Sequence, residues 1–288
     1  MKYNKGKIIK LNNKLQIFIG LWTVLLLIWA STLNAAPKSE LITFWNKSNP
    51  ANKAKINHSS WQAILNRYLS NANHRSGINR FNYAKLKKNR ADKRKFNRYL
   101  SSMQRLNPRK YSKAEQKAYW INFYNALTVK VILDNYPVKS IIKIHTGWLA
   151  FGPWDDVHAK VAGKKLNLNN IEHGILRPIW RDNRIHYAVN CASMGCPNLA
   201  AKVYTAANTE KLLDKAAKDY INHSRGVQFK NGKLLLSSIY DWYKVDFGGN
   251  KKSLIKHLRK YANSKLAKRL QSYKGSISYD YDWKLNKP

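Results

Sequence analysis

The residues best suited to chemistry are Cys191 and Cys196, the only two cysteines in a chain of 288 residues. They lie in the segment Asn190-Cys-Ala-Ser-Met-Gly-Cys-Pro197, directly after the run 184–190, which predicts a β-strand. Reactive side chains are often displayed on loops that a rigid element positions. The thiolate of cysteine is both a nucleophile and the form that exchanges with disulfides. The segment therefore predicts a site of thiol chemistry.

The two thiols are not equivalent in sequence. Cys191 is the better candidate nucleophile, because the tight turn after it could expose successive backbone amides to an anion. Cys196 precedes Pro197, which has no amide hydrogen to offer. Alternatively, Cys191 and Cys196 could form a disulfide bond, or could cycle between dithiol and disulfide. Redox pairs usually have the spacing Cys-x-x-Cys, however, and four residues separate these two.

A thiol enzyme also needs a base and a group that orients it. His186 is near in sequence, but on a regular strand an offset of five places it on the face opposite Cys191. We therefore prefer His173 as the base. Glu172 either orients this imidazole or caps its own short helix. Arg177 lies one turn after His173 and could bind a carboxylate of the substrate, and His186 is expected to contact the substrate as well.

A buried helix is expected to organise these residues. The run 113–135 is apolar almost all round, and Ser112-Lys-Ala-Glu115 before it is a capping box. Asn122 and Asn125 are polar exceptions that share one face of this helix. A buried amide must find hydrogen-bond partners. These two either tie the helix to neighbouring backbone or contact the substrate.

The remaining pattern predicts a single α+β domain with a buried central helix, additional helices and a small, mainly antiparallel sheet. Residues 59–111 form its helical N-terminal part and 112–286 the rest. The other predicted helices cover 61–69, 81–106, 171–177 and 209–222, with further helices up to Leu270. Predicted strands cover 157–161, 166–168, 184–190, 227–230, 233–237 and a segment near Ile277.

The N-terminus has the layout of a signal peptide. Five lysines and no acid precede an apolar run of about 15 residues, shorter than the roughly 20 that span a bilayer. We expect residues 1–35 to be removed, 36–58 to form a polar linker, and the mature chain to have no membrane span. The protein is then periplasmic or extracellular. The alternative is a chain that stays anchored in the inner membrane by its N-terminus.

The chain is strongly basic, with 53 Lys and Arg against 15 Asp and Glu and a net charge of +38. Loss of the five leader lysines would leave +33. No nucleic-acid-binding motif accompanies this charge, so nucleic acid is an unlikely partner and an anionic cell-envelope component is expected instead. Two cysteines and scattered histidines do not give metal-site spacing, and we predict neither metal nor cofactor.

Several motifs together resemble one family, the domain of unknown function 547 (DUF547) family. They are Tyr119-Trp-Ile-Asn-Phe-Tyr-Asn-Ala126, Ile171-Glu-His-Gly-Ile-Leu-Arg177, His186-Tyr-Ala-Val-Asn-Cys191 with Gly195-Cys-Pro197, Trp242-Tyr-Lys-Val-Asp-Phe247 and Tyr281-Asp-Trp-Lys-Leu-Asn286. The resemblance covers about 113–286 and implies a domain without implying an activity.

A weaker similarity is to papain-like and transglutaminase-like cysteine enzymes, which also combine a buried helix with short strands bearing Cys and His. In those enzymes the nucleophilic cysteine begins the central helix, whereas the run 113–135 contains no cysteine.

Three classes of function agree with these observations. We favour a cysteine hydrolase or acyltransferase acting on an amide, ester or γ-glutamyl-type bond, in which Cys191 attacks and His173 relays the proton. A non-catalytic module that binds the envelope through its basic surface is the first alternative. A thiol/disulfide redox protein is the second.

Overall fold

The structure is a computed structural model that describes residues 36–70, 76–144 and 151–288. The predicted signal peptide, 1–35, lies outside the described residues. Residues Pro37–Pro288 form one compact unit. Within the described part of the chain, no helix has the length and apolar character needed to cross a membrane.

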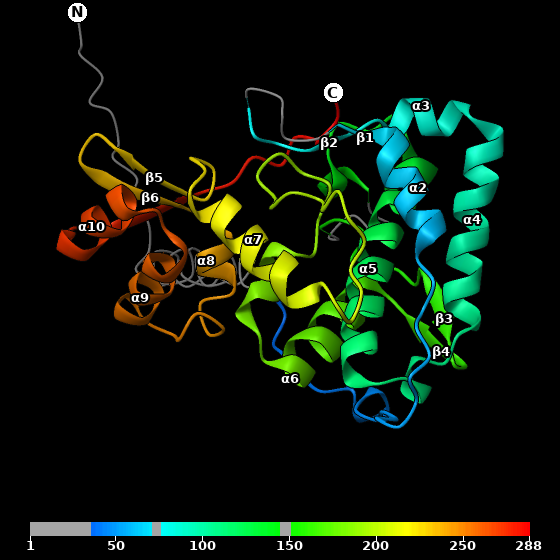
Figure 1. The fold of residues 1–288 in the computed structure, drawn as a ribbon. Coiled ribbons are helices and arrows are strands. Elements are labelled where there is room, and N and C mark those ends of the chain that lie inside the picture. The colour runs from blue at the N-terminus through cyan, green and yellow to red at the C-terminus, as the bar shows by residue number, and fades with distance from the viewer. Residues whose placement is uncertain (1–35, 71–75, 145–150) are drawn as a thin grey trace, which may run out of the picture. The chain divides into compact units, whose positions relative to one another are not determined.

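The unit has the α+β composition expected from the sequence (Figure 1). Its α-helices are α2 (Ser59–Tyr68), α3 (Tyr83–Lys88), α4 (Arg90–Arg105), α5 (Lys113–Asn135), α6 (Arg177–Trp180), α7 (Thr209–Ile221), α8 (Ile239–Trp242), α9 (Lys251–Tyr261) and α10 (Ser264–Ser272). Shorter 3-10 helices are η1 (Thr43–Trp45), η2 (Pro108–Lys110), η3 (Ile141–Lys143) and η5 (Asn183–Tyr187), and η4 (Asn170–Leu176) is a π-helix.

Three small sheets accompany the helices. β1 (Leu69–Ser70) pairs with β2 (Arg80–Phe81), and β3 (Ala159–Val161) pairs with β4 (Lys164–Leu166), both antiparallel. β5 (Val227–Lys230) pairs antiparallel with β6 (Lys233–Ser237), which pairs parallel with β7 (Ile277–Asp280). The predicted hairpins and the strand near Ile277 are therefore confirmed, with bounds shifted by a few residues.

The central helix α5 forms where the sequence predicts it. The Ser112 hydroxyl accepts a hydrogen bond from the Glu115 amide at 3.3 Å, which is one half of the capping box. The Glu115 carboxylate instead accepts the Ile56 amide at 3.1 Å, so it fastens the preceding segment to the helix. Nearly every side chain from Glu115 to Leu133 is buried. α5 is thus the element against which the surrounding segments pack.

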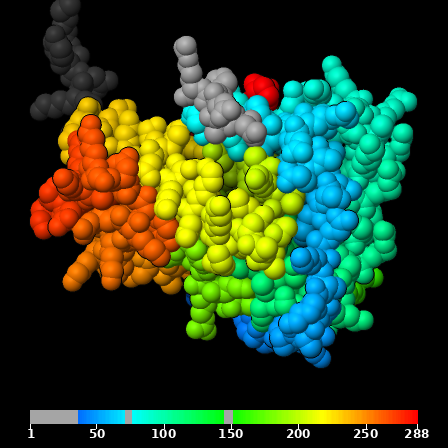
Figure 2. Space-filling view, viewed as in Figure 1, coloured from blue at the N-terminus to red at the C-terminus, as the bar shows by residue number. Residues whose placement is uncertain are grey.

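Two hydrophobic cores occupy the unit. The first surrounds α5 and includes side chains of α2, α3 and α4, and the second lies among α7, α9 and the β5-β6-β7 sheet. Figure 2 shows one face of the molecule, on which α7 lies between α2 and the C-terminal helices. After β7 the chain runs from the second core to the first (Figure 1), where Leu285 is buried and its amide donates to the Lys139 carbonyl at 2.9 Å.

Two predictions of secondary structure were wrong. The helix expected over 81–106 is broken into α3 and α4 at Asn89, whose side chain caps α4 by accepting the Asp92 amide at 3.0 Å. The strand expected over 184–190 is the 3-10 helix η5 followed by irregular backbone. Asp182 is the N-cap of η5. Its carboxylate accepts the Arg184 amide at 3.0 Å, and this local bond favours a helical turn over an extended chain.

Residues 36–58, predicted as a polar linker, lie against the domain. The Glu40 and Ile42 amides donate to backbone carbonyls of η4 at 3.0 and 2.9 Å. Trp45 is almost completely buried and packs edge-on against Trp120 of α5. Trp45 is therefore part of the first core.

Candidate functional site

The loop that carries the cysteines is held in place by Asn190. Its side-chain oxygen accepts the Ala192 amide at 2.9 Å, and its side-chain nitrogen donates to the Pro197 carbonyl at 2.7 Å. Its backbone amide donates to Asn125 of α5 at 2.8 Å. Ala192 has a positive φ of 59°, which is unusual for a residue with a side chain. The turn is thus fixed between its own two ends and the central helix.

The C-terminal segment forms the other wall of this loop. The Met194 amide donates to the Lys284 carbonyl, and the Gly195 amide to the Asp282 carbonyl, both at 2.8 Å. A Cβ at position 195 would lie 2.8 Å from the Asp282 backbone nitrogen, which explains why glycine stands there. This contact places Tyr281 directly beside Cys191.

Three side chains surround the Cys191 sulfur. It lies 3.0 Å from the Tyr281 hydroxyl, 3.2 Å from the Ser193 hydroxyl and 3.0 Å from the Cys196 sulfur. The two hydroxyls are 2.9 Å apart. Cys191 is partly exposed, Cys196 is buried, and both thiols are free. Of the two residues, Cys191 is therefore the better placed to meet a substrate.

The environment favours a thiolate at Cys191. Burial raises the pKa of this thiol, but hydrogen bonds from Cys196, Ser193 and Tyr281 outweigh it and lower the pKa from 9.0 to about 7. Burial and the neighbouring Cys191 charge raise the pKa of Cys196 well above its usual value. Loss of one proton from the pair near neutral pH therefore places the negative charge on Cys191.

Two backbone amides of the turn donate hydrogen bonds to the sulfur atoms. The Cys191 amide donates to the Cys196 sulfur at 3.0 Å, and the Ser193 amide stabilises the Cys191 thiolate. The Ala192 amide is taken by Asn190. The anion-binding turn expected after Cys191 is thus directed at the thiolate itself.

A second group of polar side chains lies beside α5, and all of them except Asp246 are buried. Glu172, His173 and Arg177 come from η4 and α6, His186 comes from η5, and Asp246 follows α8. The Arg177 guanidinium donates to Asp246 at 2.6 Å, to the Pro37 carbonyl at 2.7 Å and to Nδ1 of His173 at 2.9 Å. The structure therefore brings together four of the predicted site residues, and the carboxylate that Arg177 binds is Asp246.

His186 lies at the centre of this second group. Its Nε2 donates to Asp246 at 2.7 Å, and its ring stacks on Tyr243 with centroids 3.8 Å apart. Its Nδ1 faces Oε1 of Glu172 at 3.6 Å, and neither atom has a hydrogen-bond partner. The other Glu172 oxygen accepts the Tyr124 hydroxyl at 3.0 Å.

The charges of this group follow from their neighbours. Burial raises the pKa of Glu172, but the nearby imidazoles of His173 and His186 and the Tyr243 hydroxyl lower it to about 2. Burial, aided by Arg177, lowers the pKa of His173 to about 4, although Glu172 opposes this. At neutral pH Glu172 is an anion and His173 is neutral, with Nδ1 accepting from Arg177.

Cys191 and the predicted base do not contact one another directly. No hydrogen bond or ion pair joins Cys191 to His173 or His186, all of which lie in the described part of the chain. Two tyrosines lie near both groups. The pKa values of Tyr124 and Tyr243 are raised by burial, by Glu172 and by a negative charge on Cys191. Both tyrosine hydroxyls thus interact electrostatically with the buried acid and with the thiolate.

Asn122 and Asn125 both bind backbone, which was one of the two roles open to them. Asn122 donates to the Tyr204 carbonyl at 2.7 Å and accepts the Tyr204 amide at 3.0 Å. Asn125 donates to the Ala188 carbonyl at 2.9 Å and accepts the Asn190 amide. Asn125 therefore anchors the backbone that leads into the cysteine loop.

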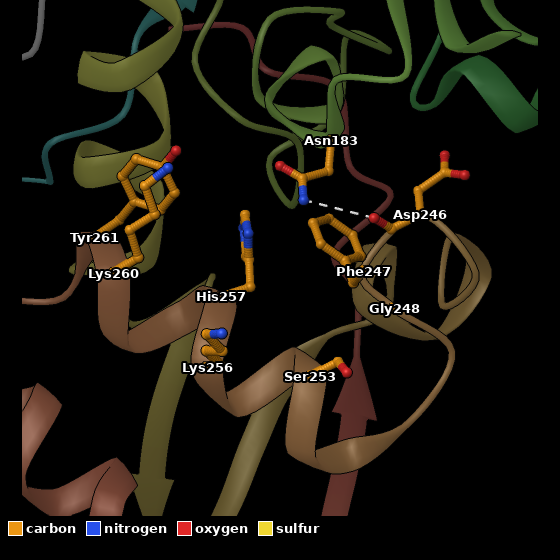
Figure 3. A pocket seen from close by; sticks show the side chains of 9 residues that line it. All are labelled: Asn183, Asp246, Phe247, Gly248, Ser253, Lys256, His257, Lys260 and Tyr261. Atoms are coloured by element: carbon orange, nitrogen blue, oxygen red, sulfur yellow. Dashed lines mark hydrogen bonds between the residues drawn. The ribbon is translucent and has the colours of Figure 1, made fainter.

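A separate cavity of about 510 Å³ opens beside α9 (Figure 3). It is lined by Asn183, Asp246, Phe247, Gly248, Ser253, Lys256, His257, Lys260 and Tyr261. Figure 3 shows the Asp246 carboxylate pointing away from His257 and Tyr261, in agreement with its bonds to Arg177 and His186. The cavity therefore borders the buried polar group but does not contain Cys191. Among the described residues, no group of three or more His, Cys, Asp or Glu could hold a metal ion.

Five residues that shape the site were not among those predicted from the sequence. They are Tyr124, Ser193, Tyr243, Asp246 and Tyr281. Each lies within or beside a motif quoted for the family resemblance, so the motifs contained the signal. These residues come from segments far apart in the sequence and meet only in the folded chain, so the sequence did not indicate that they form one site.

Comparison with known proteins agrees with the resemblance. Residues 108–221 match the profile of a family described as protein of unknown function, DUF547. The match includes α5, η4 and the cysteine loop, and it ends before Trp242-Tyr-Lys-Val-Asp-Phe247 and Tyr281-Asp-Trp-Lys-Leu-Asn286. Searches of curated proteins and of solved structures gave no match.

Proposed function

Residues 108–221 belong to the DUF547 family, and on this premise we propose that the protein is an exported cysteine-dependent hydrolase or acyltransferase of the cell envelope. The observation that carries the proposal is the environment of the sulfur of Cys191, a partly exposed residue. Ser193, Tyr281 and Cys196 surround it and lower its pKa to about 7. A nucleophile is therefore available near neutral pH without an imidazole in contact.

In the first step the Cys191 thiolate attacks the carbonyl carbon of an amide or ester. The carbonyl π bond becomes an oxyanion, and the charge leaves the sulfur. The Ser193 and Tyr281 hydroxyls, which held the thiolate, are then free to donate to this new anion. Collapse of the intermediate breaks the bond to the amine or alcohol, which takes a proton from water as it departs. An acyl thioester on Cys191 remains.

In the second step a water or an acceptor group attacks the thioester and loses a proton, and the C–S bond then breaks, which releases the acyl product and restores the Cys191 thiolate. Glu172 and His173 are our candidates for receiving it. The Glu172 carboxylate is charged and accepts the Tyr124 hydroxyl, and both Tyr124 and Tyr243 are close enough to Cys191 to sense its charge. His186 lies between the two carboxylates, 2.7 Å from Asp246 and 3.6 Å from Glu172.

Trapping of the acyl-enzyme tests this proposal. The purified protein is incubated with p-nitrophenyl esters and with γ-glutamyl p-nitroanilide, and intact mass and peptide mapping then locate any adduct. We expect an acyl group on Cys191, release of nitrophenol or nitroaniline, and loss of both in Cys191→Ala. Activity that Cys191→Ala retains would refute a nucleophilic role for this thiol.

Thiol–disulfide exchange is the second candidate, and the distance between the sulfurs favours it. The reactive thiolate lies 3.0 Å from a second, buried thiol. Cys191 would attack a substrate disulfide and release one thiol, and Cys196 would then attack the mixed disulfide, displace the second thiol and leave a Cys191–Cys196 disulfide. The substrate is reduced by two electrons and the cysteine pair is oxidised.

Cys196→Ser separates the two candidates. An acyltransferase retains the acyl adduct on Cys191, because Cys196 contributes only one hydrogen bond to the thiolate. An exchange protein stops at the mixed disulfide, which a glutathione disulfide challenge followed by intact mass reveals as a stable adduct. Acyl transfer in Cys196→Ser without any such adduct would exclude the redox function.

The positive charge of the chain supports an anionic envelope component as its partner. Lys256 and Lys260 line the cavity beside α9, and neither is in an ion pair among the described residues. This charge would concentrate the enzyme at a negatively charged polymer or lipid surface.

A further inference from the structure

Five aromatic rings gather beside the Cys191 thiol. They are Phe151, Trp154, Trp242, Tyr281 and Trp283. The centroids of Tyr281 and Trp283 are 4.6 Å apart, and Trp242 lies 4.8 Å from the former and 5.4 Å from the latter. Trp154 lies 5.9 Å from Trp283. These five residues are called the aromatic wall below.

The aromatic wall comes from three separate parts of the chain and is not sealed inside either core. Trp154 and Trp283 pack against the first core, and Trp242 and Tyr281 against the second. All four are partly exposed, and Phe151 is 56% exposed. Large aromatic side chains are usually buried, so several partly exposed rings in contact with one another indicate a binding surface.

The aromatic wall is continuous with the thiol. The Tyr281 ring belongs to the wall, while its hydroxyl lies 3.0 Å from the Cys191 sulfur. Trp242 is followed directly by Tyr243, whose hydroxyl interacts with Glu172. A molecule lying against the wall would therefore have one end at the nucleophile.

We infer that the aromatic wall binds an apolar acyl group of the substrate and presents its carbonyl carbon to Cys191. This inference rests on the proposed function and specifies its substrate class. The acyl group would be aromatic or aliphatic, and its leaving group would lie on the solvent side of the thiol.

The geometry of the rings favours an apolar group over a sugar. Neighbouring rings differ in orientation, with interplanar angles of 16° for Phe151–Trp154, 55° for Trp242–Tyr281 and 69° for Trp154–Trp283. Tilted rings form an apolar surface with several orientations, whereas a flat sugar face stacks best on one exposed ring plane. Edge-to-face contacts of this kind suit aromatic and aliphatic partners.

A pair of alkylating probes with the same reactive group tests the inference. Iodoacetamide and N-benzyl-2-iodoacetamide both alkylate Cys191, and the ratio of their second-order rates reports binding of the benzyl group. We expect the ratio to exceed that for glutathione by roughly three- to tenfold, the range that one or two aromatic contacts supply.

Two variants locate the effect. Phe151→Ala and Trp154→Ala remove rings that do not contact Tyr281, so the thiol environment should remain and the iodoacetamide rate should not change. We expect both variants to lower the probe ratio toward that of glutathione. Phe229→Ala is the matched control, because Phe229 packs on Tyr273 at the edge of the second core.

Three outcomes would overturn the inference: a wild-type ratio equal to that of glutathione, a ratio unchanged in both variants, or an equal fall of both rates. The probes alkylate irreversibly and need no turnover. Failure of the proposed function would instead appear as absence of an acyl-enzyme while the probe ratio remained high.

Discussion

Replacement of Tyr281 by phenylalanine should make Cys191 a weaker acid and therefore a slower nucleophile at neutral pH. The change removes one hydroxyl, 3.0 Å from the sulfur, and keeps the ring in the aromatic wall. A hydrogen bond to a charged group contributes roughly 1.5–3 kcal/mol, or about one to two pKa units at 1.36 kcal/mol per unit. Ser193 and Cys196 remain in place, so the lower end of this range is expected.

The size of the kinetic effect follows from the fraction of thiolate. With a pKa of about 7, half of Cys191 is ionised at pH 7. A rise of one unit lowers that fraction to roughly one tenth, and a rise of two units to roughly one hundredth. Alkylation at pH 7 should thus slow by roughly fivefold, the lower end of a range of roughly five- to fiftyfold, and the two proteins should react equally above the higher pKa.

The assay is the rate of iodoacetamide alkylation from pH 5 to 10, resolved for Cys191 by peptide mass spectrometry. Tyr279→Phe is the matched control, since this tyrosine lies on β7, two residues away, and is partly exposed. A Tyr281→Phe profile that coincides with wild type would show that this hydroxyl does not stabilise the thiolate. A rate reduced equally at every pH would point to altered access instead.

Three further predictions concern stability and binding. Burial lowers the pKa of His58 to about 4. Between pH 6.5 and 4 the unfolded state therefore binds more protons than the folded state, so the unfolding free energy should fall by up to about 1.4 kcal/mol for each unit by which the pH is lowered. Urea unfolding at several pH values should show a shallower dependence for His58→Gln, and identical slopes would contradict it. Asn122→Ala should lower the unfolding free energy by roughly 1–3 kcal/mol, because it leaves the Tyr204 backbone unpaired, while Cys191 alkylation stays unchanged; altered alkylation would argue for a role at the site. The double variant Lys256→Ala, Lys260→Ala should weaken salt-sensitive binding to anionic lipid vesicles in sedimentation, and equal binding would place the contact elsewhere.

Local patterns predicted the elements whose formation depends on neighbouring residues. The run 113–135 became α5 with the predicted bounds, because its capping serine and its apolar surface act within the helix itself. The Asn231-Gly232 turn likewise joins β5 and β6, since both residues can adopt the positive φ that such a turn needs. The strand expected before Cys191 failed for the same kind of reason, as the local bond from Asp182 favoured a 3-10 turn.

The sequence predicted which residues belong to the candidate site better than it predicted how they are arranged. Sequence motifs selected Cys191, Glu172, His173, Arg177 and His186, and the last four lie together in the fold. His173 was preferred to His186 as the partner of Cys191 because a strand was expected over 184–190, and this segment is not a strand.

By itself the sequence determined a basic α+β chain with a buried central helix and a loop bearing its only two cysteines. Only the tertiary structure decided which groups surround the thiol. Tyr281 reaches Cys191 from 90 positions away, because the C-terminal segment is bonded along the backbone of the cysteine loop. The acidity of a thiol depends on donors within hydrogen-bonding distance and on burial, and both are properties of packing between distant segments.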